Sequence, residues 1–196
     1  MATDFAILDA PLAAPAPEPE RLVDAPRLPD VLRDNLDVVF VGTAAGRRSA
    51  ELGVYYAHSG NYFWRTLWQI GLTPRRFAPQ DFAKLQSVGI GFTDLSKSGC
   101  GMDHAIAPEQ FDVAAFDAKM RRHEPRAIAF TSKKAASLWL RRRTDRISYG
   151  RQKRRVGDFC EVFVLPSPSS AARRYWKLDA WHGLADWLRA TRPWRF

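Results

Sequence analysis

Cysteine is scarce in this chain, and its scarcity sets aside several kinds of site. Only Cys100 and Cys160 occur, far apart and without a C-x-x-C spacing. Two isolated thiols are too few for an iron–sulfur cluster and lack the spacing of a zinc or redox motif. We therefore expect two free thiols packed in the interior, and a protein that works without a metal or any other cofactor.

Long hydrophobic runs are also missing. The sequence contains no run of about 18 apolar residues, the length that a membrane-spanning helix needs. Its N-terminus lacks the charged start and apolar stretch of a signal peptide. We expect no association with membranes and a cytoplasmic location.

Apolar residues are nevertheless abundant. They make up 46% of the 196 residues and include 7 Trp and 12 Phe, which is enough for one packed core. Residues 1–27 are rich in proline and alanine and show neither helical nor strand periodicity, which predicts a mobile leader. Residues 28–196 are then expected to form a single domain that acts as a monomer.

Acidic residues are outnumbered, and the excess of positive charge is concentrated in one segment. The net charge is +9, and residues 121–155 contain 13 lysines and arginines against only Glu124 and Asp145. Such a segment is expected to bind a polyanion such as DNA, because neutralising phosphates releases counterions. On charge alone, a solvated basic surface without a partner is the alternative.

Four short apolar runs alternate with helical patterns along the chain. The runs, rich in β-branched and aromatic residues, cover residues 37–42, 87–93, 126–131 and 159–165. The spacing of apolar residues predicts helices over residues 61–72, 79–86, 108–123, 132–140 and 179–191, with residues 141–155 as an irregular or hairpin-like insert. This alternation predicts an α/β fold, a three-layer α/β/α sandwich around a four-stranded, mostly parallel sheet.

Loops that carry glycine or polar residues follow three of the predicted strands. They cover residues 42–46, 94–101 and 166–171. Ligands bind beyond the carboxyl ends of the strands in open α/β sheets, so we expect these loops to form one cleft. Each loop alone is a weak signal, since an ordinary glycine turn or a serine-capped helix start has the same composition.

The three motifs, in this order, resemble the uracil-DNA glycosylase superfamily over about residues 28–187. The pattern Gly42-x-x-x-Gly46 and the helix entry Gly60-Asn61-x-Phe63-Trp64 are similar to the mismatch-specific uracil and thymine glycosylases. Tyr55-Tyr56-Ala57-His58, Asp94 after Gly89-Ile90, and Leu165-Pro166-Ser167 are closer to the hypoxanthine-DNA glycosylases. The resemblance implies an enzyme that flips a damaged base out of DNA and hydrolyses its glycosidic bond without a cofactor.

Two positions depart from the family pattern. Mismatch-specific enzymes carry an asparagine that positions the attacking water, where this chain has Ala44. Their third motif begins with a polar residue that holds the leaving base, where this chain has Leu165. Either the chemistry has moved to Asn61 and Asp94, or the chain binds damaged DNA without cutting it.

The chemistry of the reaction favours the first alternative. Breaking an N-glycosidic bond passes through an oxocarbenium-like sugar, and a carboxylate can stabilise that charge and place a water beneath it. Asp94 is the predicted catalytic carboxylate, with a turn or helix cap as its alternative role. Asn61 is expected to hold the water or read the base edge, as the resemblance implies, with capping of the next helix as its alternative.

The remaining contacts are assigned to the same loops. Tyr56 matches the aromatic residue that stacks on the extruded base. The other predicted substrate-binding residues are Gly42, Thr43, Ala44, His58, Phe92, Ser167, Ser169 and Ser170, and the predicted DNA-binding residues are Arg47, Arg154, Arg155 and Arg173.

The leading hypothesis is a monofunctional DNA glycosylase that removes uracil and starts base excision repair. Hypoxanthine or a mismatched base is the alternative substrate, because uracil and hypoxanthine both present a carbonyl beside a ring N–H. A non-catalytic module that binds damaged DNA is the alternative from another class. A lyase is disfavoured, since a Schiff base needs a lysine in the cleft and only Lys97 lies near a motif.

Overall fold

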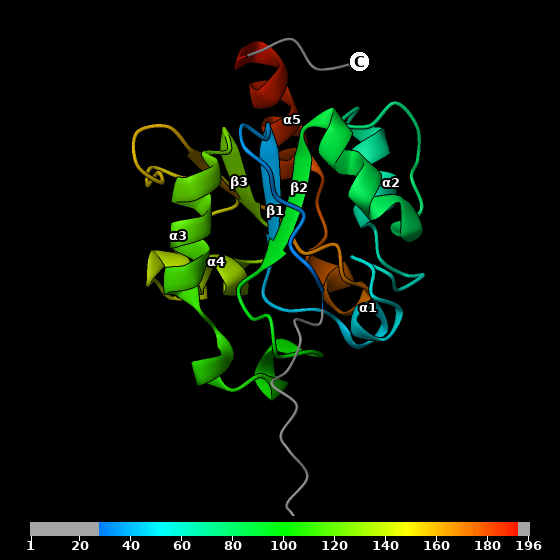
Figure 1. Ribbon diagram of the computed structural model, residues 1–196, viewed down its shortest axis with the longest axis vertical. Coiled ribbons are helices and arrows are strands. Elements are labelled where there is room, and N and C mark those ends of the chain that lie inside the picture. Colours follow the sequence, from blue (N-terminus) through cyan, green and yellow to red (C-terminus); the bar gives the residue numbers. More distant parts are fainter. Residues whose placement is uncertain (1–27, 192–196) are drawn as a thin grey trace, which may run out of the picture.

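The computed structural model describes residues 28–191, which contain one five-stranded sheet (Figure 1). The strands lie in the order β2-β1-β3-β5-β4. Four of them are parallel, β1 (Val38–Gly42), β2 (Ile90–Asp94), β3 (Ala127–Phe130) and β5 (Glu161–Val164), while β4 (Gly150–Arg151) runs antiparallel to β5. The predicted fold class is confirmed, with one strand more than the four expected.

Helices cover both faces of this sheet. One face packs against α2 (Phe63–Gln69), α5 (Asp179–Thr191) and the 3-10 helix η1 (Pro79–Val88), and the other against α3 (Val113–His123) and α4 (Lys133–Leu140). Short elements complete the chain: α1 (Arg47–Leu52), η2 (Asp103–Ala105), η3 (Pro108–Gln110), η4 (Thr144–Arg146) and η5 (Ser170–Tyr175). The predicted three layers are therefore present, with α3 and α2 on opposite flanks of the sheet in Figure 1.

Strand β1 lies at the centre of the core. Val38 and Phe40 point to the α2 and α5 side, whereas Val39 and Val41 point to the α3 and α4 side, and all four are fully buried. The ring of Phe40 meets that of Phe63 edge-on, with 5.0 Å between centroids. Burial on both faces explains why this strand reads as a continuous apolar run instead of an alternating one.

Helix boundaries and the burial of one apolar residue differ from the prediction. The helix predicted over residues 61–72 is shorter, and Trp68, one of the apolar residues whose spacing predicts that helix, is 50% exposed. The helix predicted over residues 108–123 divides into η3 and α3, because the Asp112 side chain accepts a hydrogen bond from the Ala115 N–H (2.7 Å) and caps α3. The local cap at Asp112 thus divides a segment that the spacing of apolar residues alone predicts as one helix.

The predicted insert over residues 141–155 is partly regular. It contains η4 and then β4, whose Gly150 pairs with Val164 of β5, so the hairpin-like interpretation is confirmed for this part. A two-residue strand is too short to show a period, and the partner strand defines it. The fifth strand could not be read from the sequence for that reason.

Both cysteines are free: Cys160 is buried and Cys100 is half-buried. Burial, followed by the charge of Glu161, raises the pKa of the Cys160 thiol to about 12. No helix within residues 28–191 has the length and apolar character to cross a membrane. The predicted leader, residues 1–27, lies outside the described residues, as do residues 192–196.

Candidate active site

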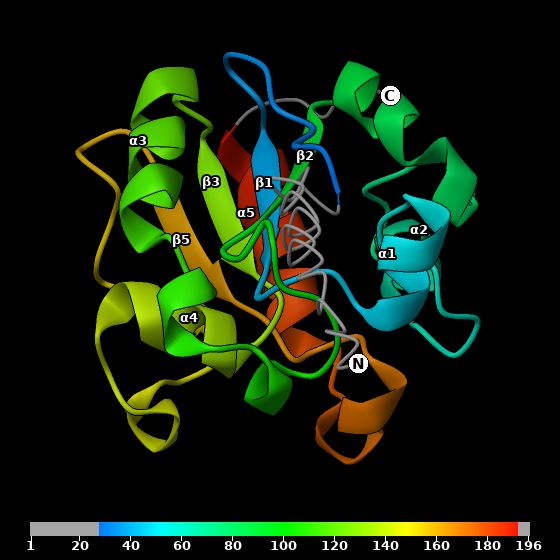
Figure 2. The same cartoon turned by 60° about the horizontal axis from the view of Figure 1, so that its bottom comes forward.

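The carboxyl ends of the parallel strands open on one edge of the sheet, where the predicted loops gather. Figure 2 turns this edge forward and shows α1 and the loop after β2 there. The first two loops are joined by backbone hydrogen bonds, from Ser96 N–H to the Thr43 carbonyl (2.9 Å) and from Gly101 N–H to the Ala45 carbonyl (2.8 Å). The third loop is tied to residues 55–62, the aromatic segment between α1 and α2, by Tyr62 N–H, which donates to the Pro168 carbonyl (2.9 Å).

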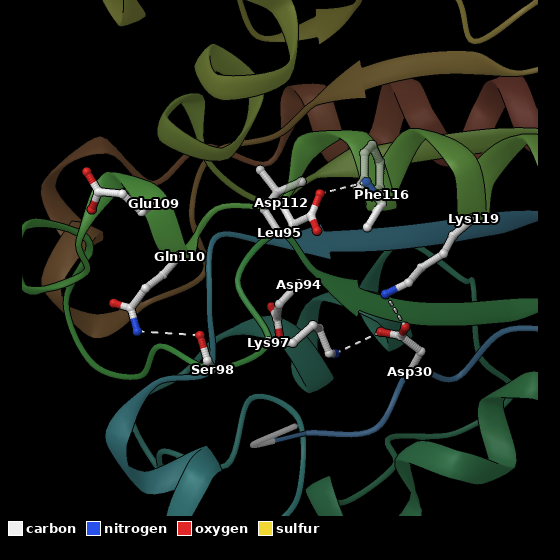
Figure 3. A pocket seen from close by; sticks show the side chains of 11 residues that line it. Asp30, Asp94, Leu95, Lys97, Ser98, Glu109, Gln110, Asp112, Phe116 and Lys119 are labelled. Atoms are coloured by element: carbon white, nitrogen blue, oxygen red, sulfur yellow. Dashed lines mark hydrogen bonds and ion pairs between the residues drawn. The ribbon is translucent and has the colours of Figure 1, made fainter. Parts of the chain in front are cut away.

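Asp94 ends β2 beside Gly42, its partner in the sheet register, and lines a cavity of about 490 Å³ (Figure 3). The carboxylate is almost wholly buried, with 6% of the residue exposed. A Cβ on residue 42 would clash with Asp94 Oδ1. Only glycine at position 42 therefore leaves room for the carboxylate where it lies.

The surroundings of Asp94 bring its titration close to neutral pH. Burial raises the pKa of this carboxyl most strongly, Lys97 and Lys119 lower it, and Asp30 raises it, with a resulting pKa of about 7. At neutral pH both protonation states are populated. A carboxyl of this kind can accept a proton from a water and return it, which general acid–base catalysis requires.

One wall of the cavity is an ion cluster. Asp30 accepts hydrogen bonds from Lys97 Nζ (2.8 Å), Lys119 Nζ (2.7 Å) and the Thr93 hydroxyl (2.7 Å). Burial alone would raise the pKa of Asp30, but the hydrogen bonds from Lys119 and Lys97 outweigh it and the pKa is lowered. Two ammonium groups thus share one carboxylate and leave a net positive charge beside Asp94 (Figure 3).

The other wall is polar. Gln110 Nε2 donates to Ser98 Oγ (3.4 Å) and bridges η3 to the loop after β2. Glu109 and Asp112 add carboxylates to the lining. Among the described residues, no group of three or more His, Cys, Asp or Glu is placed to hold a metal ion.

Tyr56 lies at the centre of this edge in a strained backbone conformation. Its φ of 52° is in the left-handed region, which costs a non-glycine residue about 1–2 kcal/mol. Its ring stacks on Phe63 with 3.8 Å between centroids and 10° between planes, and its hydroxyl donates to Thr131 Oγ1 (3.4 Å) at the end of β3. One face of the ring is covered, so at most the opposite face is free to stack on a base.

A second cavity, of about 440 Å³, is lined by Tyr56, His58, Asn61, Trp64, Arg76 and Phe77 among others. The Asn61 side-chain carbonyl accepts a hydrogen bond from Phe63 N–H (2.9 Å), which is the capping role given as the alternative. Its amide nitrogen makes no hydrogen bond within residues 28–191. Asp94 and Asn61 therefore line different cavities, and the predicted catalytic pair is not brought together in one.

Tyr56 lines the second cavity and lies near Asp94 of the first. Burial raises the pKa of its hydroxyl most, the Thr131 hydrogen bond lowers it, and the charge of Asp94 raises it. Tyr56 thus lines the cavity of Asn61 while lying close enough to Asp94 to be influenced by its charge.

Most other predicted substrate contacts shape the loops. His58 is exposed, and its Nδ1 accepts a hydrogen bond from Gly60 N–H (3.0 Å). Ser167 Oγ accepts from Ser169 N–H (3.3 Å), and Ser169 Oγ accepts from Ala171 N–H (3.4 Å) and caps η5, next to Ser170. Each of these bonds leaves the serine hydroxyl hydrogen available to a ligand.

Three further predicted contacts differ in how accessible they are. Thr43 is buried and Ala44 is half-buried in the first loop. Phe92 is fully buried and stacks on Tyr55, with 5.1 Å between ring centroids. Phe92 therefore packs against Tyr55 and Tyr56 within the core and offers no surface to a substrate.

The four predicted DNA-binding arginines do not lie together. Arg155 is paired with Glu161, the first residue of β5, and so lies at the amino edge, opposite Asp94. The Arg154 guanidinium packs over the Trp139 ring at 4.3 Å. Arg47 begins α1 and Arg173 lies over the Tyr62 ring at 5.3 Å, so these two exposed arginines are the ones beside the cleft.

Sequence reasoning missed Asp30, Lys119 and Arg76 as lining residues. Asp30 bonds to Thr93, which is 63 positions further along the chain, and no local pattern indicates such a pairing. Lys119 lies on a helix whose periodicity identifies only its apolar face. Lys97 was noted only as a lysine near a motif.

Comparison with known proteins identifies the family. Residues 29–189 match the Uracil DNA glycosylase superfamily, so the match spans most of the chain. A solution NMR structure of a proposed uracil DNA glycosylase from Methanosarcina acetivorans is 26% identical, with a TM-score of 0.58 over 84% of this chain and 97% of that one. The resemblance seen in the sequence is confirmed, and the chain belongs to the uracil DNA glycosylase superfamily, with the activity class of a DNA glycosylase.

Proposed function

We propose that this protein removes uracil from DNA by hydrolysing its N-glycosidic bond, with Asp94 as the catalytic carboxylate, and so starts base excision repair. The observation that carries the proposal is the position of Asp94, a buried carboxyl with a pKa of about 7 that ends a parallel strand and lines the cavity at the ligand edge. Uracil is favoured as the base because the similar solved structure is described as a uracil DNA glycosylase.

The reaction follows from this arrangement. The target nucleotide leaves the DNA stack, and the bond between the sugar C1′ and the base nitrogen breaks, with the electron pair leaving on the base. Ionised Asp94 stabilises the positive charge that develops on the sugar and accepts a proton from the water that attacks C1′. The products are an abasic site and the base anion, which becomes the free base when it takes up a proton from Asp94 or from solvent.

Holding the leaving base is a separate task. Ala44 and Leu165 offer no polar side-chain atom for it, and Leu165 is fully buried. Asn61 lines the second cavity together with Tyr56, and its side-chain amide nitrogen makes no hydrogen bond within residues 28–191. This amide is therefore the group available to a base that stacks on the free face of Tyr56.

Monofunctional hydrolysis is favoured over a lyase reaction. A lyase needs a free amine to attack C1′ and form a Schiff base. Lys97 and Lys119 are the two lysines of the Asp94 cavity, and both are ion-paired with Asp30. Borohydride treatment during turnover should therefore trap no covalent complex between protein and DNA.

Release of free base from labelled DNA tests the proposal. Oligonucleotides that carry uracil, hypoxanthine, xanthine or a mismatched thymine, single- and double-stranded, are compared under single-turnover conditions, with Asp94→Asn as the inactive control. We expect the fastest release from uracil. Faster release of hypoxanthine would instead support the substrate indicated by the run Tyr55-Tyr56-Ala57-His58. Tight binding of uracil-containing DNA with no release of any base would indicate the non-catalytic module.

A further inference from the structure

Two exposed tyrosines, Tyr149 and Tyr175, lie at the ligand edge, outside the cavities described above. Tyr175 is 54% exposed and ends η5, directly after the third loop, whereas Tyr149 is 38% exposed and precedes β4. Gly150 pairs with Val164 near the carboxyl end of β5, which places Tyr149 at the same edge. Burial and then the charge of Tyr175 raise the pKa of the Tyr149 hydroxyl, so the two hydroxyls lie within electrostatic range of each other.

Each of these rings carries a cation on its face. Lys133 Nζ lies 4.6 Å from the centroid of the Tyr149 ring, and the Arg174 guanidinium lies 4.6 Å from that of Tyr175. Arg173 is exposed on the same short helix, and residues 166–178 contain no acidic side chain. The surface therefore combines flat aromatic rings with positive charge. Nucleotides match both features, because they carry flat bases and negative phosphates, whereas a purely acidic or purely apolar partner would match only one of them.

The rings lie along the same sheet edge as Asp94 but several strands away from it. From β2, which ends at Asp94, to β4 the sheet takes four steps of about 4.8 Å, or roughly 19 Å in all. That span exceeds one nucleotide by several fold, since the rise per nucleotide of one strand is about 3.4 Å. The tyrosines would thus meet bases several positions away from the flipped one.

We propose that Tyr149 and Tyr175 form a stacking platform for unpaired bases of single-stranded DNA. Bases in a duplex are covered by their neighbours, so exposed aromatic faces can stack only on bases that are unpaired. Lys133, Arg173 and Arg174 neutralise the phosphates of the same strand. The location of the target base rests on the proposed function, whereas binding to the platform requires no catalysis.

Binding of undamaged DNA tests the platform directly. The probe is a fluorescent single-stranded oligothymidine, compared with a duplex of the same length by anisotropy. Stacking contributes about 1–3 kcal/mol per base, so Tyr149→Ala with Tyr175→Ala should weaken single-strand binding by roughly 5- to 150-fold or more, and duplex binding by much less. The double Phe variant keeps both rings and should bind like the unchanged protein.

Phe159→Ala provides the matched control. Phe159 is 37% exposed and lies beside Gly157 in the hairpin before β5, at the opposite edge. Its removal should alter neither measurement. The double Leu variant tests the same loss with a bulkier apolar side chain, in case the Ala variants unfold.

Three results would overturn the platform. They are unchanged single-strand binding in the Ala and Leu variants, an equal loss for single strand and duplex, or a loss in the Phe variant as large as in the Ala variant. Because the probe contains no uracil, a failure of uracil release by the unchanged protein leaves this test intact, and the two proposals fail independently.

Discussion

At the scale of single residues, Gly42 and Asp94 form one unit. Gly42 is predicted from the sequence to contact the substrate, and the group that lies directly against it in the structure is the carboxylate of Asp94. Asp94 itself could be predicted because an apolar strand delivers it to the ligand edge. Its ion cluster could not, because Asp30 and Lys119 come from distant segments and meet only in the folded chain.

The rate of base release should depend on the ionisation of Asp94. With a pKa of about 7, the carboxylate that stabilises the sugar forms as the pH rises, so single-turnover release should increase between pH 6 and pH 8 and then level off. Asp94→Asn should slow release by about 100-fold or more and remove this pH dependence, while DNA binding stays near normal. If the variant kept the same midpoint, another group would be responsible for it.

Asp94 should also destabilise the fold as the pH rises. Its folded pKa of about 7 exceeds the ordinary value of 3.8, so between these pH values the folded state binds the proton more tightly than the unfolded state does. The contribution of Asp94 to stability is therefore greatest at low pH and is lost as the pH rises through 7. The gain in unfolding free energy from Asp94→Asn should grow by about 2 to 3 kcal/mol from pH 5 to pH 8.

Denaturant unfolding at the two pH values measures this gain, with Asp158→Asn, an exposed position at the opposite edge, as the control. A variant that is less stable than the unchanged protein at pH 8 would contradict the burial of an unpaired carboxyl. The combination expected here, a slower but more stable enzyme, is typical of a catalytic group kept at the expense of the fold.

At the scale of elements, caps and pairings limited what the sequence could predict. Ser132, the first residue of the helix predicted over residues 132–140, caps α4 by accepting from Ala135 N–H (3.0 Å), and this signal is local. The start of α2 has a local bond, from Phe63 N–H to the Asn61 side chain, and also a distant one, from Tyr62 N–H to the Pro168 carbonyl in the third loop. Boundaries fixed by such distant partners leave no trace in the local pattern.

Asn61 caps the start of α2 and also lines the second cavity, and two substitutions distinguish these roles. Asn61→Ala removes the acceptor for Phe63 N–H and should cost about 1 kcal/mol of stability, and it should also slow base release. Asn61→Asp keeps the acceptor but loses the amide, so its melting temperature should stay near normal while release remains slow. Near-normal release by Asn61→Asp would reduce the residue to a cap.

At the scale of the whole molecule, the distribution of charge decides which face meets DNA. The density of basic residues in 121–155 indicated that segment, yet Arg155 is committed to Glu161 at the amino edge and Arg154 to Trp139. The sequence gives the number of charged residues in a segment, but it cannot show which of them form ion pairs or ring contacts in the folded protein. The positive groups beside the cleft include Arg47 and Arg173, which lie on two short helices, α1 and η5.

Salt dependence of duplex binding distinguishes the two faces. Each phosphate contact contributes about −0.9 to the slope of log affinity against log salt, so Arg173→Ser should flatten the slope by up to about 1. Arg155→Ser should leave it unchanged, because its partner is Glu161 and not a phosphate. A flatter slope for Arg155→Ser with none for Arg173→Ser would place DNA on the basic segment after all.

The close fit of Gly42 against Asp94 also constrains how such a site can evolve. A carboxylate can lie where Asp94 places it only if residue 42 is glycine, since any side chain there would occupy the space of Asp94 Oδ1. A substitution at position 42 therefore displaces the carboxylate from the site. Among related sequences, we expect a larger residue at position 42 to occur together with a change at position 94.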